Sequence, residues 1–214
     1  MDNDELLYIE DAKKRKLFYR FTPAAFISNF VPLVVVLHGK DGAGATHFEH
    51  KMWNVLTPLD SFTDKKNGAY WLGEEGDFFV KDLLQSLIRQ ISQECECEDH
   101  IYLYGSGMGG YGAILHGVLC KANAVYAHTP QVRLRGTGHK EYDLSSLLND
   151  TDPFPIFYLC GIEKNSAEDD MASFIDACKR HDIKFKLEYC EKDADEVQNL
   201  KKVLNFFERM VSMA

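Results

Sequence analysis

A cluster of glycines between an apolar run and a helix-like segment contains the candidate catalytic residues of this chain. Residues 101–115 read Ile-Tyr-Leu-Tyr-Gly-Ser-Gly-Met-Gly-Gly-Tyr-Gly-Ala-Ile-Leu, which predicts a strand, a sharp turn and a helix. In the nucleophile elbow G-x-S-x-G, the central residue takes a strained backbone angle, and small residues two positions away on either side let strand and helix approach. A frame centred on Ser106 puts a bulky tyrosine and methionine at those flanking positions, whereas a frame centred on Gly107 puts glycines there. The second frame fits, so the predicted nucleophile position has no side chain.

The same glycines also match a phosphate-binding pattern. Gly105, Gly107 and Gly110 have the G-x-G-x-x-G spacing of a dinucleotide site. That motif usually belongs to the first βαβ unit and needs an acidic residue at the end of the next strand. Here the next predicted strand ends in Ala-His-Thr at residues 127–129. We therefore expect no dinucleotide, and the chain is expected to use no cofactor.

Residues 104–113 resemble the G-S-S-M-G-G-Y-G-A elbow of bacterial α/β-hydrolase-fold esterases and acyltransferases. The capsular polysaccharide O-acetyltransferases and the O-acetyltransferase-like component of the accessory Sec system are closest in pattern. Residues 127–134, Ala-His-Thr-Pro-Gln-Val-Arg-Leu, are similar to the N/S-P-Q-x-(K/R)-L stretch of that group. The resemblance covers roughly residues 30–210, although only the elbow is specific. It implies an α/β-hydrolase fold, with a mostly parallel central sheet and helices on both faces.

The resemblance also implies a catalytic triad in the chain order serine, acid, histidine. Glu163 matches the acid position, with Asp169 as the second choice. The histidine should lie in the loop before the last helix, but residues 190–197 contain none, and Asp195 falls at the histidine position. Gly107 and Asp195 thus replace two of the three triad members. A glycine cannot form an acyl intermediate, and an aspartate facing Glu163 would be a like-charge pair.

The anion-binding half of such a site is expected to survive. The turn containing Gly39 and Lys40 resembles the oxyanion-hole loop, and the backbone N–H groups of Met108 and Gly109 are expected to point at the same spot. Ser106 is expected to line this ligand-binding spot as well.

Two other histidines lie near the predicted site. His128 ends a predicted strand at the carboxyl edge, where α/β sites lie, so it is a candidate substitute base. His38 is interpreted as architectural. His47 and His50 have i,i+3 spacing, but no third ligand is evident, so they are interpreted as surface residues and no metal site is expected.

These residues lead to one main hypothesis and two alternatives. The main one is a pseudoenzyme: a non-catalytic binding or partner protein related to esterases and O-acetyltransferases of surface glycan processing. The first alternative is an active acyl-ester hydrolase or O-acetyltransferase, if Gly107 stands in place of a natural serine and another histidine serves. The second is hydrolysis by a water that His128 directs. A small acyl or glycan ligand, a protein partner and a homo-oligomer all stay open.

Apolar periodicity predicts the strands and helices around these residues. Strand and helix patterns alternate along the chain, which is typical of βαβ units around a parallel sheet. An antiparallel hairpin is predicted at the sheet edge from residues 6–9 and 16–21, and Asp77 is a candidate cap for the helix after it. Residues 129–153 are predicted to be a polar excursion and a candidate small cap. The remaining expected strands are 33–37, 53–56, 101–104, 124–127, 156–160 and 183–189, and the helices are 78–91, 111–119, 167–180 and 196–210.

Length and composition suit one globular domain over residues 1–214. The formal net charge is −9, which disfavours nucleic acid because phosphate backbones are repelled. No signal-peptide pattern and no long apolar run are present, so a cytoplasmic protein without a membrane segment is expected. The six cysteines are therefore expected to be thiols. Cys160 and Cys190 are interpreted as small core residues, and Cys95 and Cys97 as surface thiols in a turn.

Overall fold

The computed structural model describes residues 6–26, 28, 30–39, 47–60, 70–73, 76–134, 143–150, 152–162, 167–190 and 196–211. One eight-stranded sheet runs through them in the order β1-β2-β4-β3-β5-β6-β7-β8. The strands are β1 (Leu7–Glu10), β2 (Lys16–Thr22), β3 (Leu33–Leu37), β4 (Asn54–Leu59), β5 (Ile101–Ser106), β6 (Ala124–His128), β7 (Ile156–Ile162) and β8 (Phe185–Cys190). The predicted strands are all present, and β4 is longer than the sequence pattern indicated.

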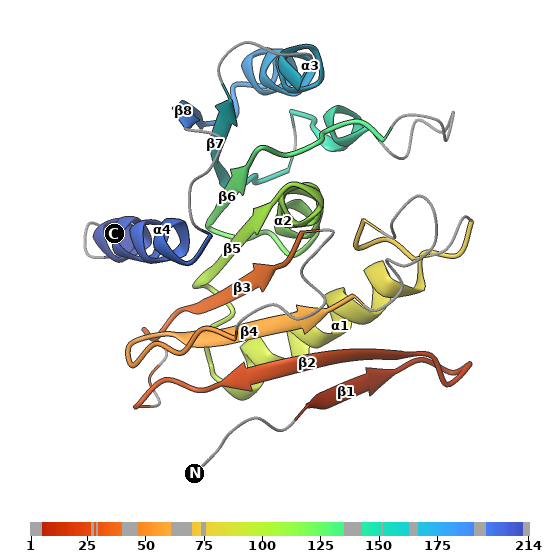
Figure 1. The fold of residues 1–214 in the computed structure, drawn as a ribbon, viewed down its shortest axis with the longest axis vertical. Coiled ribbons are helices and arrows are strands. Elements are labelled where there is room, and N and C mark those ends of the chain that lie inside the picture. Colours follow the sequence, from red (N-terminus) through yellow and green to blue (C-terminus); the bar gives the residue numbers. More distant parts are fainter. Residues whose placement is uncertain are drawn as a thin grey trace.

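The sheet is mostly parallel, as predicted. Strands β4, β3, β5, β6, β7 and β8 pair in parallel, whereas β2 pairs antiparallel with both β1 and β4. The predicted N-terminal hairpin is therefore confirmed, and Figure 1 shows it at one edge of the sheet. The carboxyl ends of all six parallel strands lie along the same side of the sheet. Strand β5, which leads into the elbow, and its neighbour β3 lie at the centre of the strand order.

Helices cover both faces of the sheet (Figure 1). They are α1 (Phe79–Glu94), α2 (Met108–Leu119), α3 (Ala167–Arg180) and α4 (Glu196–Val211). Side chains from α1, α2 and α3 share one buried cluster with Leu33, Val35 and Leu37. Side chains from α4 share a second cluster with Val34. Because successive residues of a strand point to opposite faces, β3 needs an unbroken apolar run, and its sequence Leu-Val-Val-Val-Leu supplies one.

The start of α1 differs from the prediction that Asp77 caps it. The residue before the helix is Phe78, and no side chain caps that end. The Asp77 carboxylate instead accepts from Arg15 Nη1 at 2.7 Å and from Lys13 Nζ at 3.1 Å. The guanidinium of Arg15, followed by the Lys13 ammonium, lowers the pKa of Asp77. Asp77 therefore ties the β1–β2 hairpin to the start of α1, a pairing between distant residues that helix periodicity does not reveal.

The polar excursion after β6 is held against the body of the protein. Arg133 donates from Nη2 and Nε to Asp143 Oδ2 at 2.7 and 3.0 Å, and the two residues form an isolated bridge. Asp143 also caps the short 3-10 helix η2 (Leu144–Leu147) by accepting from the Ser145 N–H. Leu144 is fully buried, so η2 anchors the returning chain. The tip of the excursion lies outside the described residues.

Two predictions about cysteines were wrong. Cys97 was interpreted as a surface thiol, but it is buried, and burial raises its pKa to about 12. Cys160 is buried as expected, but it is disulfide-bonded rather than a free thiol. Disulfide formation requires two sulfur atoms at a specific separation, which tertiary structure decides and sequence spacing does not show. Free thiols in the described residues are those of Cys95, Cys97, Cys120 and Cys178.

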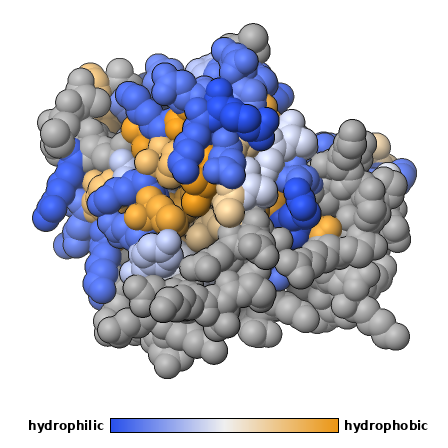
Figure 2. All heavy atoms as spheres, turned by 90° about the horizontal axis from the view of Figure 1, so that it is seen from above, coloured by the Kyte–Doolittle hydropathy of each residue, from blue (hydrophilic) through white to orange (hydrophobic). Residues whose placement is uncertain are grey.

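Among the described residues at the α3 end of the sheet, hydrophilic side chains surround a smaller apolar area (Figure 2). Asp176, Lys179 and Arg180 of α3 are exposed there. None of the helices in the described part of the chain combines the length and the apolar character that crossing a bilayer requires.

Candidate functional site

Gly107 forms a sharp turn between β5 and α2 at the carboxyl edge of the sheet. Its backbone has φ 54° and ψ −114°, a combination that side-chain-bearing residues rarely adopt. The turn is anchored at both ends. The Gly107 N–H donates to His128 O at 2.9 Å, and the Gly107 carbonyl accepts from the Tyr111 N–H at 3.1 Å. Gly107 thus occupies the strained apex that a nucleophile elbow requires.

The glycines on either side of Gly107 are required by close backbone contacts. A Cβ atom on Gly105 would overlap the Gly109 backbone, and a Cβ atom on Gly109 would overlap the Leu37 carbonyl. A Cβ atom on Gly107 would meet nothing within 4 Å. The open space lies at the apex and the tight contacts lie two residues away on each side. This geometry matches the frame centred on Gly107.

The start of α2 presents backbone N–H groups beside this apex. Met108 is the first residue of α2, and the first N–H groups of any helix have no partner within the helix. Gly107, the residue before the helix, offers no side-chain cap. Gly39 lies alongside, because a Cβ atom built on it would be 3.2 Å from the Ser106 carbonyl oxygen. Helix N-terminal N–H groups of this kind stabilise anions.

His38 supports the turn that contains Gly39. Its side chain is buried, and its Nδ1 donates to the Gly39 carbonyl at 2.8 Å while Nε2 accepts from the Asp60 N–H at 3.0 Å. Both ring nitrogens are therefore engaged in joining the ends of β3 and β4. The Trp71 Nε1–H donates to the His38 carbonyl at 3.3 Å, which adds a second brace.

Trp71 is held in turn by His116 of α2. His116 Nε2 donates to the Trp71 carbonyl at 3.0 Å, and Nδ1 accepts from Gln85 of α1 at 2.8 Å. Complete burial lowers the pKa of His116 to about 4, so the ring is neutral at pH 7. The chain of contacts from His116 through Trp71 to His38 fixes the loop on one side of the elbow. Nothing in the sequence around Trp71 and Asp60 indicates a role for them, because only the fold brings them next to His38.

Ser106 and His128 form a pair next to the elbow. They are the last residues of β5 and β6 and lie opposite each other in the register. The Ser106 Oγ and His128 Nδ1 atoms are 3.2 Å apart. Burial lowers the pKa of His128, so its ring is neutral at pH 7. His128 Nε2 is buried and has no hydrogen-bond partner among the described residues. Both side chains continue the face that Tyr104 and Tyr126 share with α4.

Several predicted site residues lie outside the described residues. Lys40, Glu163 and Asp195 are among them, so the structure does not place the acid or the histidine position. Asp169 lies within α3, but its side chain is not described. The structure brings together the remaining predicted site residues: Gly39, Ser106, Gly107, Met108, Gly109 and His128.

His47 differs from its interpretation as a surface residue. It is half-buried, and its ring joins the Thr22 hydroxyl at 2.7 Å to the Thr57 hydroxyl at 2.9 Å. His47 therefore bridges β2 and β4. Within the described part of the chain, no three metal-ligating side chains come together.

No family model and no curated protein sequence matches this chain. Solved structures do. An S-formylglutathione hydrolase from Agrobacterium tumefaciens is 16% identical, with a TM-score of 0.68, over 97% of this chain and 94% of that one. The substrate-bound fluorophosphonate-binding serine hydrolase F of Staphylococcus aureus is 15% identical, with a TM-score of 0.69, over 97% of both chains. A capsule O-acetyltransferase of Neisseria meningitidis serogroup A is 17% identical, with a TM-score of 0.66, over 97% and 94%. At such identities the likeness shows the fold, which is the predicted α/β-hydrolase fold.

Proposed function

We propose that this protein binds the acyl or carboxylate group of a ligand at its elbow without forming an acyl intermediate. The main support for this proposal is Gly107, which occupies the strained apex of the elbow with φ 54° and ψ −114°. A glycine lacks the hydroxyl that would attack an acyl group. The N–H groups at the start of α2 can still donate to a carboxylate or carbonyl oxygen. A site with donors and no nucleophile binds an acyl compound without cleaving it.

We further propose that the ligand is an acylated glycan. This proposal rests on the sequence resemblance to polysaccharide O-acetyltransferases. The structural likeness to a capsule O-acetyltransferase also supports it. The similar structures also include an S-formylglutathione hydrolase and a ferulic acid esterase. An O-acetylated sugar carries the small acyl group that the elbow would hold.

A second candidate function rests on the Ser106–His128 pair. A serine hydroxyl 3.2 Å from a neutral imidazole nitrogen has the geometry of a nucleophile and its base. In this mechanism, Ser106 Oγ would attack the acyl carbon while His128 Nδ1 takes its proton and passes it to the leaving group. A triad base is normally oriented by an acid, and His128 Nε2 has no such partner among the described residues. The binding function is therefore the better supported of the two.

Labelling with a fluorophosphonate probe separates the two candidates. The binding function predicts no covalent adduct with the probe and no burst of product from p-nitrophenyl acetate. It also predicts that acetate shifts the NMR signal of the Trp71 indole N–H, which lies beside the site. Ser106→Ala should leave acetate binding intact. Stoichiometric labelling of Ser106 would contradict the binding function. If Ser106→Ala and His128→Gln both abolished that labelling, the protein would be a hydrolase that uses this pair.

Rebuilding the triad tests the loss of catalysis directly. Gly107→Ser alone should give little esterase activity, because the new hydroxyl would lack a general base. The double change Gly107→Ser with Asp195→His should be more active, with Glu163 orienting the imidazole, and the gain should be strongly non-additive. Esterase rates of the wild type, both single variants and the double variant provide the measurement. Efficient turnover by Gly107→Ser alone would mean that a working base is already present.

A further inference from the structure

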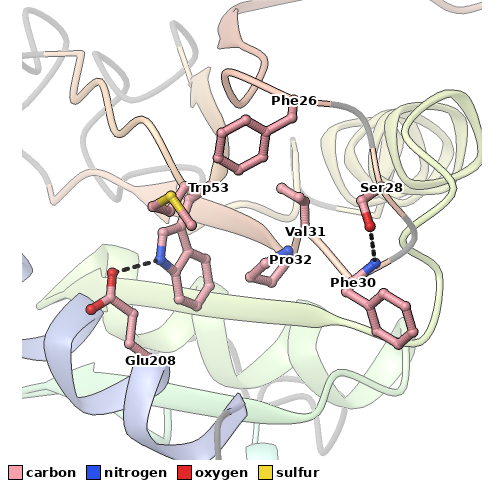
Figure 3. A pocket seen from close by; sticks show the side chains of 8 residues that line it. Phe26, Ser28, Phe30, Val31, Pro32, Trp53 and Glu208 are labelled. Carbon is pink, nitrogen blue, oxygen red and sulfur yellow. Dashed lines mark hydrogen bonds between the residues drawn. The ribbon is translucent and has the colours of Figure 1, made fainter.

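A concave site lies at the amino ends of the parallel strands, away from the elbow at their carboxyl ends. It has a volume of about 510 Å³, which is within the usual range for small-molecule sites. Val31 and Pro32 precede β3 and Trp53 precedes β4, so the pocket lies where these parallel strands begin. Ligand sites in α/β proteins usually lie at the carboxyl ends of the strands. This pocket is therefore separate from the candidate active site, and Figure 3 shows the side chains that line it.

Hydrogen bonds hold the wall of this pocket in place. Asn54 of β4 accepts from the Ala24 N–H at 3.0 Å and donates to the Val31 carbonyl at 3.4 Å. The Ala25 N–H donates to the Lys51 carbonyl at 2.9 Å. The segment between β2 and β3 is thereby fastened to the start of β4 at several points, so the pocket is built into the fold.

The pocket walls are aromatic and apolar, yet several of them face solvent. Phe30 is 72% exposed and Phe26 is 53% exposed, and Met52 beside them is also exposed. The Trp53 ring at the base is 1% exposed and packs edge-on against Tyr102. Exposed aromatic side chains around a buried aromatic base offer apolar surface to a ligand.

One charge lies in this apolar setting. Glu208 of α4 is the sole charged residue among the described residues that line the pocket. Its Oε1 accepts from the Trp53 Nε1–H at 3.4 Å, which holds the carboxylate against the aromatic base (Figure 3). His50 Nε2 lies 3.6 Å from the same oxygen, so a protonated His50 would compete for this carboxylate.

We infer that this pocket binds a small organic ammonium ion that carries an aromatic or apolar body. The apolar body lies against Phe26, Phe30 and Met52, and the ammonium meets Glu208 and the aromatic faces. A carboxylate attracts the cation, and aromatic rings attract cations through their quadrupole. The net charge of −9 adds a field of the same sign. An anionic ligand would be repelled by the Glu208 carboxylate, and a neutral ligand would gain no charge attraction from it.

The two tryptophans of the chain provide a direct assay, because they lie at opposite ends of the parallel strands. The Trp53 indole N–H contacts Glu208 in the pocket, whereas the Trp71 indole N–H contacts His38 beside the elbow. The probes are phenethylammonium, 2-phenylethanol and phenylacetate, which have similar shapes and different charges. They are titrated at pH 8, where ordinary imidazoles are neutral and alkylammonium groups stay charged.

Phenethylammonium should shift the Trp53 signal and leave the Trp71 signal in place. It should bind about 5- to 10-fold more tightly than 2-phenylethanol, and this preference should shrink with added salt. Phenylacetate should leave the Trp53 signal unchanged. A shift of the Trp71 signal by phenylacetate would report on the elbow and would not bear on this pocket.

Two variants and a control identify the groups responsible. Glu208→Gln keeps an oxygen that accepts from Trp53 but removes the charge, so the ammonium and the alcohol should bind equally. Phe30→Ala should weaken both ligands, and because Phe30 is 72% exposed the fold should tolerate the change. Asp82→Asn removes an exposed carboxylate of α1 and should change neither affinity. A Trp53 signal that ignores phenethylammonium, equal binding of ammonium and alcohol to the wild type, or no effect of Glu208→Gln would each overturn the inference.

Discussion

At the scale of single residues, Gly107 combines an open position with a costly backbone angle. No atom lies within 4 Å of a Cβ built there, so a side chain would fit, but φ 54° with ψ −114° strains any residue other than glycine. Gly105 presents the opposite case, because its Cβ would overlap the Gly109 backbone. Side-chain size at flanking positions was enough to choose the frame from the sequence. The backbone angle itself was visible only in the structure.

Alanine substitutions should separate strain from overlap at these positions. Gly107→Ala should lower the free energy of unfolding by about 1–3 kcal/mol, the usual cost of a strained backbone angle. Gly105→Ala should lower it further, because backbone atoms of Gly109 would have to move. Gly76→Ala is the control for backbone strain without atomic overlap, since Gly76 has φ 76° and open space in an unrelated turn. Denaturant titrations provide the measurement. A Gly105→Ala variant as stable as the wild type would contradict the close approach of β5 and α2.

At the scale of elements, apolar periodicity predicted the four α-helices and the eight strands of the described residues, with ends displaced by a few residues, but not the short 3-10 helix η2. Partner choice between elements was not predictable in the same way. Asp77 pairs with Arg15, which lies between β1 and β2, and does not cap α1. His116 joins α2 to Gln85 of α1 and to Trp71. Periodicity reports which face of an element is buried. It does not report which buried polar groups meet across elements.

The buried His116 should make the stability of this helix pair depend on pH. Folding lowers the pKa of His116 to about 4, whereas in the unfolded chain its pKa is the ordinary 6.5 of a histidine. Stability is therefore full above pH 6.5 and is lost as the pH falls towards 4, by about 3 kcal/mol in total.

Denaturant unfolding at pH 7 and pH 4.5 tests this expectation. The loss of stability between the two pH values should be smaller in His116→Gln than in the wild type by about 2–3 kcal/mol. His100→Gln, a change in a half-buried loop residue, should show the wild-type pH dependence. Equal losses in His116→Gln and the wild type would show that His116 does not carry this effect.

At the scale of the whole molecule, the sheet separates two candidate ligand sites. The elbow lies where β3 and β5 end, and the aromatic pocket lies where β3 and β4 begin. From Pro32 to Gly39 an extended chain spans roughly 20 Å, so the two sites share no contacts. In the two proposals, the elbow binds negative groups through N–H donors, and the aromatic pocket binds positive groups through Glu208.

Ligands at the two sites should therefore bind independently. The affinity for acetate, followed by the Trp71 indole signal, should be the same with and without saturating phenethylammonium. The converse titration, followed at Trp53, should also show no change, because coupling between two sites is reciprocal. A change in either affinity of more than about twofold would reveal coupling through the sheet.

The fold class, the order of the main elements and the frame centred on Gly107 could be inferred from the sequence alone. These follow from local patterns: the apolar run of residues 33–37, the helix periodicities, and glycines spaced around residue 107. Four features became visible only in the folded chain: the strain at Gly107, the burial of Cys97, the disulfide at Cys160 and the hydrogen bonds of His38 with Trp71 and Asp60. Each of these depends on atoms far apart in the chain. Their contact is set by how strands and helices pack, which no local pattern encodes.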